Sequence, residues 1–264
     1  MERYFEIGIT NLNSFKAFMT TESLIIIFVA LAAGSLVKGI SGLGLPLTAI
    51  PVMASFMDVD RAVAIMVIPG VLINIWLLWT YRASAVQIPK LPLVCVTGVL
   101  GVVAGALILS SVPGWYLLLA MAIWLGAYLL TLIFRLKLTS AGPVTKHMPL
   151  FVVGAAGVIQ GAIGTAGPVL APYVHSLNLK QPQYVFVVSV LFQIFALTQL
   201  VSFIWLGLID LERAYESMLA CIPIAIFLPL AVWLSRFFND RAFNALIVGL
   251  LVVIEIRLIW RIMT

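Results

Sequence analysis

Two short segments rich in glycine and proline interrupt apolar runs that are otherwise long enough to cross a membrane. They are residues 38–46 (KGISGLGLP) and, 122 positions later, residues 160–168 (QGAIGTAGP). Glycine and proline break helices, and a break inside hydrocarbon leaves backbone N–H and C=O groups without water. Such breaks are tolerated where they line a cavity. Paired breaks in the two halves of a chain are therefore the best sequence indication of a transporter's binding site.

Composition places the chain in a membrane. Of its 264 residues, 63% are hydrophobic and only 9% are charged, and the mean hydropathy is +1.18. A soluble domain needs more charged surface, so we expect an integral membrane protein in contact with the lipid bilayer. The net charge of +5 is the basic excess usual in cytoplasmic loops. No basic patch with interleaved aromatic residues occurs, so nucleic acid is not an expected partner.

Apolar stretches of about 20 residues predict an all-α protein with about eight transmembrane segments. They are 23–38 with 46–57, 61–82, 89–110, 113–134, 149–162 with 168–177, 183–207, 212–234 and 240–262. The last four follow the first four at a spacing of 122 residues, within a few positions. We therefore predict two homologous four-segment repeats, each with a broken first segment. The predicted parts are an interfacial helix or mobile tail at 1–22, repeats at 23–134 and 149–264, and a loop at 135–148.

The distribution of Lys and Arg predicts the orientation. If each broken segment crosses the membrane once, one side holds ten basic residues and both termini, and the other side holds four. Both termini would then be cytoplasmic. If the broken segments are re-entrant hairpins, the count is six against eight and decides nothing. Four crossings per repeat would make the repeats parallel and an odd number would make them inverted; charge favours four.

Lys38 is the only Lys or Arg well inside an apolar run, and it directly precedes the glycines of the first break. An ionisable residue within a span is costly and is by default a functional candidate. Its charge could bind an anion, or its long side chain could reach an interface. The equivalent residue in the second half, Gln160, is neutral but is still a hydrogen-bond donor.

Each break also predicts a set of backbone donors. Pro46 and Pro168 suit the start of a new half-helix, whose unpaired N–H groups and partial positive charge bind anions. Close helix packing is the alternative explanation of the glycines, but it does not explain the paired prolines. Asn74 and Gln193, in the segments after the breaks, could face the same pocket or bond between helices. The predicted substrate-binding residues are Lys38, Gly39, Ser41, Gly42, Gly44, Pro46, Asn74, Gln160, Gly161, Gly164, Thr165, Gly167, Pro168 and Gln193.

The other polar residues predict no catalytic or metal site. No nucleotide-binding loop, metal motif or nucleophile motif occurs, so we expect no enzyme activity, no cofactor and no metal. The spans contain no acidic pair, which favours an anionic or neutral substrate over a cation. Residues expected in solvated turns or at interfaces are Asp58, Asp60, Arg61, His175, Asp210, Glu212 and Arg213. Glu255 and Arg257 lie near the exit of the last span and could pair there.

The motif G-x-S-G-x-G-x-P at 39–46, followed by Pro51, and the motif QG-x-x-G-x-x-GP at 160–168 resemble those of the TauE/SafE sulfite exporter family. This family is also called the 4-toluene sulfonate uptake permease family. The resemblance covers the chain from about residue 23, in size, duplicated unit and both motifs. It implies a bacterial inner-membrane carrier of sulfite, sulfoacetate or a related anion. Leu43 and Leu45 stand where family members often have more glycine, so the exact substrate is not implied.

We therefore expect a secondary transporter that exports a small anion by alternating access, as one repeat rocks against the other. An anion channel built on the same half-helix ends is an alternative, as is an uptake permease for a sulfonate or other small organic anion. A small anionic substrate is the expected partner. The sequence leaves open the direction, proton coupling and oligomeric state, a homodimer included.

Overall fold

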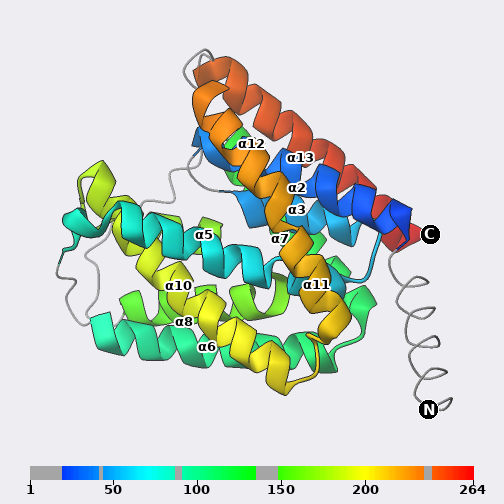
Figure 1. Cartoon of the computed structure of the whole chain (residues 1–264), viewed down its shortest axis with the longest axis horizontal. Helices are drawn as coiled ribbons and strands as arrows, with labels where there is room; N and C mark the ends of the chain where they lie inside the picture. The colour runs from blue at the N-terminus through cyan, green and yellow to red at the C-terminus, as the bar shows by residue number, and fades with distance from the viewer. Residues whose placement is uncertain (1–19, 42–43, 87–90, 135–147, 235–239) are drawn as a thin grey trace, which may run out of the picture.

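The computed structural model describes residues 20–41, 44–86, 91–134, 148–234 and 240–264. In these ranges the backbone forms helices and no strand, which confirms the all-α class (Figure 1). The predicted tail before residue 20, Gly42 and nearly all of the loop 135–148 lie outside the described residues. The helices are α2 (Thr21–Ser41), α3 (Leu45–Ala54), α4 (Val59–Ile65), α5 (Val67–Thr80), η1 (Arg82–Ser84), α6 (Leu91–Ser111), α7 (Gly114–Ile133), α8 (Met148–Ile163), α9 (Gly167–His175), α10 (Gln181–Trp205), α11 (Leu211–Leu219), α12 (Cys221–Leu234) and α13 (Asp240–Met263).

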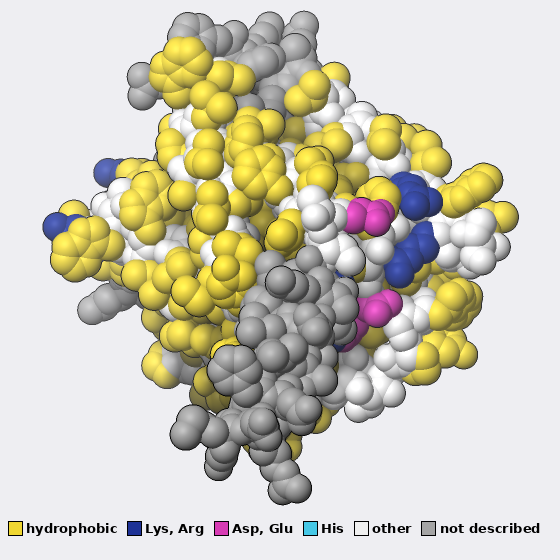
Figure 2. Space-filling view, turned by 45° about the vertical axis from the view of Figure 1, so that its right-hand side comes forward, with side chains coloured by type: hydrophobic (Ala, Val, Ile, Leu, Met, Phe, Trp, Pro, Cys, Tyr) yellow, Lys and Arg dark blue, Asp and Glu magenta, His cyan; other side chains and the backbone are white. Residues whose placement is uncertain are grey.

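Six candidate membrane spans occur among the described residues, by length and composition. Two of them combine consecutive helices, α4 with α5 and α11 with α12. α3 and α8 are apolar but shorter, with 10 and 16 residues. The face drawn in Figure 2 is mostly hydrophobic, and its charged side chains gather in small patches. This surface suits a multi-pass membrane protein, because side chains in contact with lipid must be apolar.

The first predicted break lies between α2 and α3. α2 ends at Ser41, and α3 begins at Leu45. Gly44 caps α3 with φ 107°, an angle that glycine adopts without steric cost. Pro46 is the second residue of α3, where its missing N–H leaves no hydrogen bond unmade. The helix therefore breaks where predicted, and the proline stands at the second position of the new helix rather than at the expected first position.

The second predicted break lies between α8 and α9. α8 ends at Ile163, and α9 begins at Gly167. Gly164 has φ 73°, and Pro168 is the second residue of α9. The same local chemistry thus interrupts both apolar runs at the predicted places.

Each new helix folds back along the helix before it. A Cβ atom on Gly34, in α2, would lie 2.8 Å from the carbonyl oxygen of Leu45 and 3.1 Å from Ala49 Cβ in α3. Similarly, Met148 at the start of α8 and Tyr173 near the end of α9 line one hollow. The pairs α2–α3 and α8–α9 are therefore hairpins, whereas the charge count favoured straight crossings. Gly34 makes the hairpin possible because a side chain there would hold α3 away.

Small residues also bring helices from different parts of the chain together. A Cβ atom on Gly101 of α6 or Gly161 of α8 would overlap the backbone of the other helix. A Cβ atom on Gly39 of α2 would overlap Ala231 of α12. The backbones of α6 and α8, and of α2 and α12, can therefore approach closely, as in other membrane helix pairs.

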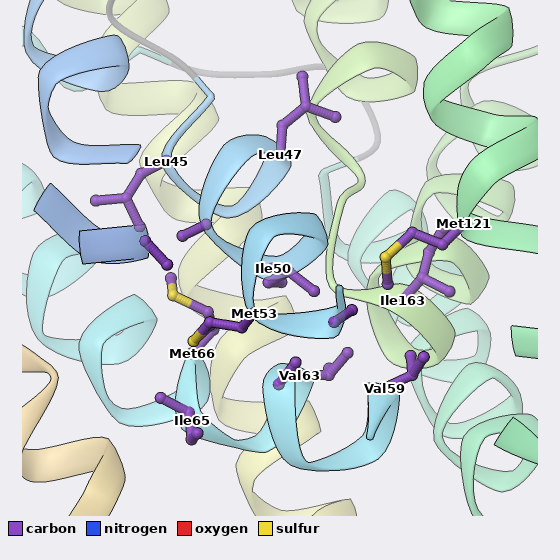
Figure 3. Close-up of a cluster of buried hydrophobic side chains, with 14 of the residues drawn as sticks. Leu45, Leu47, Ile50, Met53, Val59, Val63, Ile65, Met66, Met121 and Ile163 are labelled. Atoms are coloured by element: carbon purple, nitrogen blue, oxygen red, sulfur yellow. The ribbon is translucent and has the colours of Figure 1, made fainter. Parts of the chain in front are cut away.

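The main hydrophobic core surrounds α3. Ile50 and Met53 of α3 are 0% exposed. Figure 3 shows them near Val63 of α4 and Met66 at the α4–α5 junction, with Ile163 of α8 to one side. Burying a side chain of this size stabilises a fold in water by roughly 1.5–3 kcal/mol, and within lipid the close packing has the larger role. The core therefore fixes the first hairpin against α4, α7 and α8.

Two further helix pairs are antiparallel. α5 and α10 pack side by side (Figure 1). η1, at the end of α5, contacts α10, and α11, at the end of α10, contacts α4, which precedes α5. α7 and α13 also pack together. Gly126 lies against Glu255, whereas Ile133, seven residues later in α7, and Val248, seven residues earlier in α13, line the same cavity.

Candidate functional site

A cavity of about 1030 Å³ lies between the two hairpins and helices α5, α7, α10 and α13. The breaks, 122 residues apart in sequence, meet in this one chamber. Nine of the predicted site residues line it: Lys38, Gly44, Pro46, Asn74, Gln160, Gly164, Thr165, Gly167 and Pro168.

Lys38 provides the positive charge of the cavity. It stands in the last turn of α2, is half-buried, and forms no ion pair or hydrogen bond with any described residue. The lining contains no Asp or Glu among the described residues. Because the apolar walls lower the local dielectric constant below that of bulk water, an uncompensated ammonium group attracts an anion more strongly here than it would in solvent.

The start of α3 adds neutral donors beside this charge. The N–H groups of Leu45 and Leu47 belong to the first turn of the helix, so they have no partner within it. Thr48, one residue further, is 0% exposed, lines the cavity, and has a hydroxyl group without a partner among the described residues. Buried polar atoms are normally hydrogen-bonded, so an orphaned hydroxyl in a cavity wall indicates a place for a ligand or water.

The second break supplies a similar set, with one difference. Gly167 begins α9 with a free N–H, and the buried hydroxyl of Thr165 has no partner among the described residues. Gln160, however, is fully engaged. Its Nε2 donates to Gln199 Oε1 (3.0 Å), its Oε1 accepts from the Ala166 N–H (3.4 Å), and its carbonyl accepts from Gln199 Nε2 (2.9 Å). Gln160 therefore holds the break in shape, whereas Lys38 is free.

Five predicted site residues are not placed in the cavity lining. Gly39 and Gly161 lie at helix contacts, with α12 and α6 respectively, because their positions on the helix turn them away from the cavity. Gln193 is buried in α10 next to a lining residue but does not line the cavity itself. Gly42 and the side chain of Ser41 lie outside the described part of the chain.

The structure also adds polar residues that the sequence did not single out. Thr48, Gln199, Tyr128 and Thr131 all line the cavity. A hydroxyl in the first turn after a proline start could have indicated Thr48. Gln199 stands out as a polar residue within an apolar span, and nothing local marks Tyr128 or Thr131. His175, expected at an interface, lines the cavity as well; its ring stacks on Tyr184 with 4.4 Å between ring centroids.

Ion pairs join α4 to α11 outside the lining of the cavity. Arg61 Nε and Nη2 donate to the two carboxylate oxygens of Glu216 at 3.2 and 2.5 Å, and Glu216 is only 1% exposed. Arg213 Nη2 donates to Asp60 Oδ2 at 2.9 Å. The sequence assigned Asp60, Arg61 and Arg213 to solvated turns; instead, α4 and α11 carry them to one another. We call these four residues, with Ser217, the clamp.

Ser217 attaches the clamp to the cavity wall. Its hydroxyl donates to the Ile65 carbonyl (2.7 Å) and accepts from the Ile68 N–H (3.2 Å), across the junction of α4 and α5. Val63 and Met66, from the same junction, line the cavity. The clamp therefore holds one wall of the chamber in place.

Comparison with known proteins identifies one matching family. The family model described as "Sulfite exporter TauE/SafE" matches residues 26–258, which include every described residue that lines the cavity. The proteins of this family are transporters rather than enzymes. No curated protein and no solved structure matches the chain significantly. By the extent of the match, the chain belongs to the TauE/SafE sulfite exporter family.

Proposed function

We propose that this chain is a secondary carrier that exports a small anion, sulfite or an organosulfonate such as sulfoacetate, across the bacterial inner membrane by alternating access. One observation carries the proposal: two half-helix starts and Lys38 converge on a cavity with no carboxylate among its described lining residues. Family membership supports an anion as the substrate.

In this proposal, the oxygens of the anion bind the Lys38 ammonium group, the free N–H groups of α3 and α9, and the hydroxyls of Thr48 and Thr165. Hydrogen bonds to charged groups contribute about 1.5–3 kcal/mol each. Apolar wall residues, among them Phe192 and Leu251, would accommodate the organic part of a sulfonate.

We further propose that the two halves are inverted repeats, 23–134 and 149–264. Helices begin at equivalent places 122 residues apart, α3 and α9 at Leu45 and Gly167, and α4 and α10 at Val59 and Gln181. The contacts also correspond: α2 packs on α12 as α8 packs on α6, and the antiparallel pairs α5–α10 and α7–α13 join equivalent helices. A two-fold axis in the membrane plane would produce this pattern.

The cavity lining divides in a way that supports alternating access. At its centre both members of an equivalent pair line the cavity, for example Lys38 with Gln160 and Pro46 with Pro168. Toward one end of the cavity, only one member of each equivalent pair lines it. His175, Ile133 and Val248 are in the lining, whereas their equivalents, Met53, Glu255 and Gly126 respectively, are not. The one-sided residues would form the open path to one face. If the two halves exchanged conformations, the cavity would close at this end and open at the end where the clamp lies.

The clamp favours a carrier over a channel. A channel needs one continuous path, whereas Arg61–Glu216 and Arg213–Asp60 join α4 to α11 at one end. Opening that end requires these pairs to separate, and a buried ion pair is costly to break. The membrane potential would assist the exit of an anion by about 2.3 kcal/mol per charge per 100 mV.

The test is exchange of labelled sulfite and sulfoacetate by the purified chain in proteoliposomes. We expect saturable uptake that unlabelled anion on the far side accelerates, and its near abolition in Lys38→Ala. Lys180→Ala, at an exposed lysine outside the cavity, is the matched control. Non-saturating flux or discrete currents would establish the channel instead, and no flux of either anion would refute the proposal.

Orientation is a separate prediction. The count of ten against four that placed both termini in the cytoplasm assumed straight crossings, and hairpins reduce it to six against eight. A cysteine added after Thr264 and labelled in whole cells with a membrane-impermeant reagent decides it. Labelling would place the clamp end of the molecule outside, because Arg261 of α13 binds the carbonyl of Met57 just before α4.

A further inference from the structure

Glu255 is a carboxyl group within α13 that the proposed anion site does not use. Its Oε2 atom is buried and has no hydrogen-bond partner among the described residues. Across from it, a Cβ atom on Gly126 of α7 would lie 3.2 Å from Glu255 Oε1, so the glycine leaves room for the carboxyl group. Val248 and Leu251 precede it by seven and four residues and line the cavity. Glu255 therefore continues the same face of α13, one turn beyond the chamber.

The described residues around Glu255 offer no compensating charge. On α13, Arg257 lies over the ring of Phe56, 5.0 Å from its centroid. Arg261 donates to the carbonyls of Ala54 and Met57 and pairs with Asp58 at 3.9 Å. α7 brings Tyr128, two residues from Gly126, and α3 brings no titratable side chain. An ionised carboxylate without a partner is strongly unfavourable among apolar groups, whereas the protonated acid is tolerated.

The proposed inverted repeat predicts in which state of the carrier Glu255 would contact water. The residue 122 positions earlier is Ile133, which lines the end of the cavity that was assigned above to the open path. In the opposite state, Glu255 would take the place that Ile133 has now, in a path open at the clamp. We propose that Glu255 is a proton-binding site that exchanges its proton with water only when the carrier is open at the clamp end. This inference rests on the proposed function.

The consequence is a pH-dependent return step. At the clamp end the carboxyl group releases its proton to water as the carboxylate forms. Before α7 and α13 can close around it again, the carboxylate must take one proton from the water on that face, which regenerates the neutral acid. The return therefore depends on the pH at the clamp face and not on the pH at the other face.

Transport in membrane vesicles of opposite orientation tests this directly. Sulfoacetate flux is measured in right-side-out and inside-out vesicles while the external buffer alone changes from pH 6 to pH 8. We expect a several-fold slowing in the orientation that exposes the clamp face and none in the other. Glu255→Gln should remove the response, and Glu212→Gln, in the first turn of α11, should keep it. A pH response retained in Glu255→Gln, or one equal from both faces, would overturn the proposal.

A second measurement does not depend on transport. A hydrophobic carbodiimide modifies protonated carboxyl groups in apolar surroundings, and mass spectrometry locates the product. We expect modification at Glu255 in the wild-type chain at neutral pH and less of it at alkaline pH in Arg61→Ala, where the broken clamp favours the opposite state. If no vesicle transports anion, the proposed function fails while labelling still reports on Glu255. An unmodified Glu255 would refute the proton site by itself.

Discussion

The two breaks share a backbone design and differ in the side chain that precedes the glycines. Each resumes its helix with a glycine at positive φ nearby and proline in the second position. At the first break, Lys38 has no partner among the described residues. At the second, Gln160 forms three hydrogen bonds that connect α8, α9 and Gln199 of α10. One half therefore supplies charge, and the other supplies a fixed backbone.

This asymmetry has a physical reason. The residue equivalent to Gln199 in the first half is Leu77, which cannot hold Lys38 by hydrogen bonds. A lysine at position 160 would place two like charges in a chamber that contains no described carboxylate, and their repulsion is strong where the local dielectric constant is below that of bulk water. In the proposed repeat, the two cradles would thus be similar in backbone, and differences at two positions would make only one of them cationic.

The largest expected effect comes from making the first break like the second. Lys38→Gln removes the charge but keeps a donor, so we expect about a 100-fold loss of transport at low substrate concentration, which is roughly 2.7 kcal/mol. Gln160→Leu should change apparent substrate affinity less than tenfold. Initial rates at low substrate concentration measure both. Equal losses in the two variants would contradict the division of roles.

Alanine at the equivalent glycines Gly39 and Gly161 should lower the stability of the fold by different amounts. A Cβ atom on Gly161 would overlap backbone atoms of α6, whereas one on Gly39 meets mainly the methyl group of Ala231. We expect Gly161→Ala to destabilise the fold by about 2–3 kcal/mol and Gly39→Ala by less. Thermal unfolding of detergent-purified protein provides the comparison. A larger loss for Gly39→Ala would show that α2–α12 packing is the tighter contact.

Removing the amide partner should loosen the second break alone. Gln199→Leu leaves the Gln160 amide without its partner in a buried setting, which costs about 1–3 kcal/mol. We expect a lower unfolding temperature and a moderate loss of transport. Leu77→Ala, at the equivalent position of the first half, is the control and should leave substrate affinity unchanged. Unaltered stability in Gln199→Leu would mean that the Gln160–Gln199 pair does not support the break.

The smallest expected effects concern the two hydroxyl groups. Thr48→Val and Thr165→Val keep the shape of the side chain and remove one donor from each cradle. Each should weaken anion binding by about fivefold, near 1 kcal/mol, and the double variant should show the sum. Thermal-shift titration with sulfite and sulfoacetate measures this. An effect from only one threonine would assign the anion to that half.

Much of the candidate site could be predicted from local sequence. Gly44 and Gly164, Pro46 and Pro168, and Lys38 could be recognised because backbone freedom and an ionisable group in an apolar run are properties of single residues. The side of the helix on which each glycine lies was harder to predict, because the same glycine can approach a ligand or another helix. Gly39 and Gly161 were therefore assigned to the substrate but lie at helix contacts. The clamp was missed because its partners are about 150 residues apart.

The sequence by itself determined the membrane environment, the helical class and the two interruptions, because hydropathy and the helix-breaking chemistry of glycine and proline act within a few neighbouring residues. Only the tertiary structure decided that each interrupted segment folds back, that Gln160 is held and Lys38 is not, and that Asp60, Arg61, Arg213 and Glu216 meet. These outcomes depend on which distant helix faces each side chain, and packing of the whole chain selects that partner.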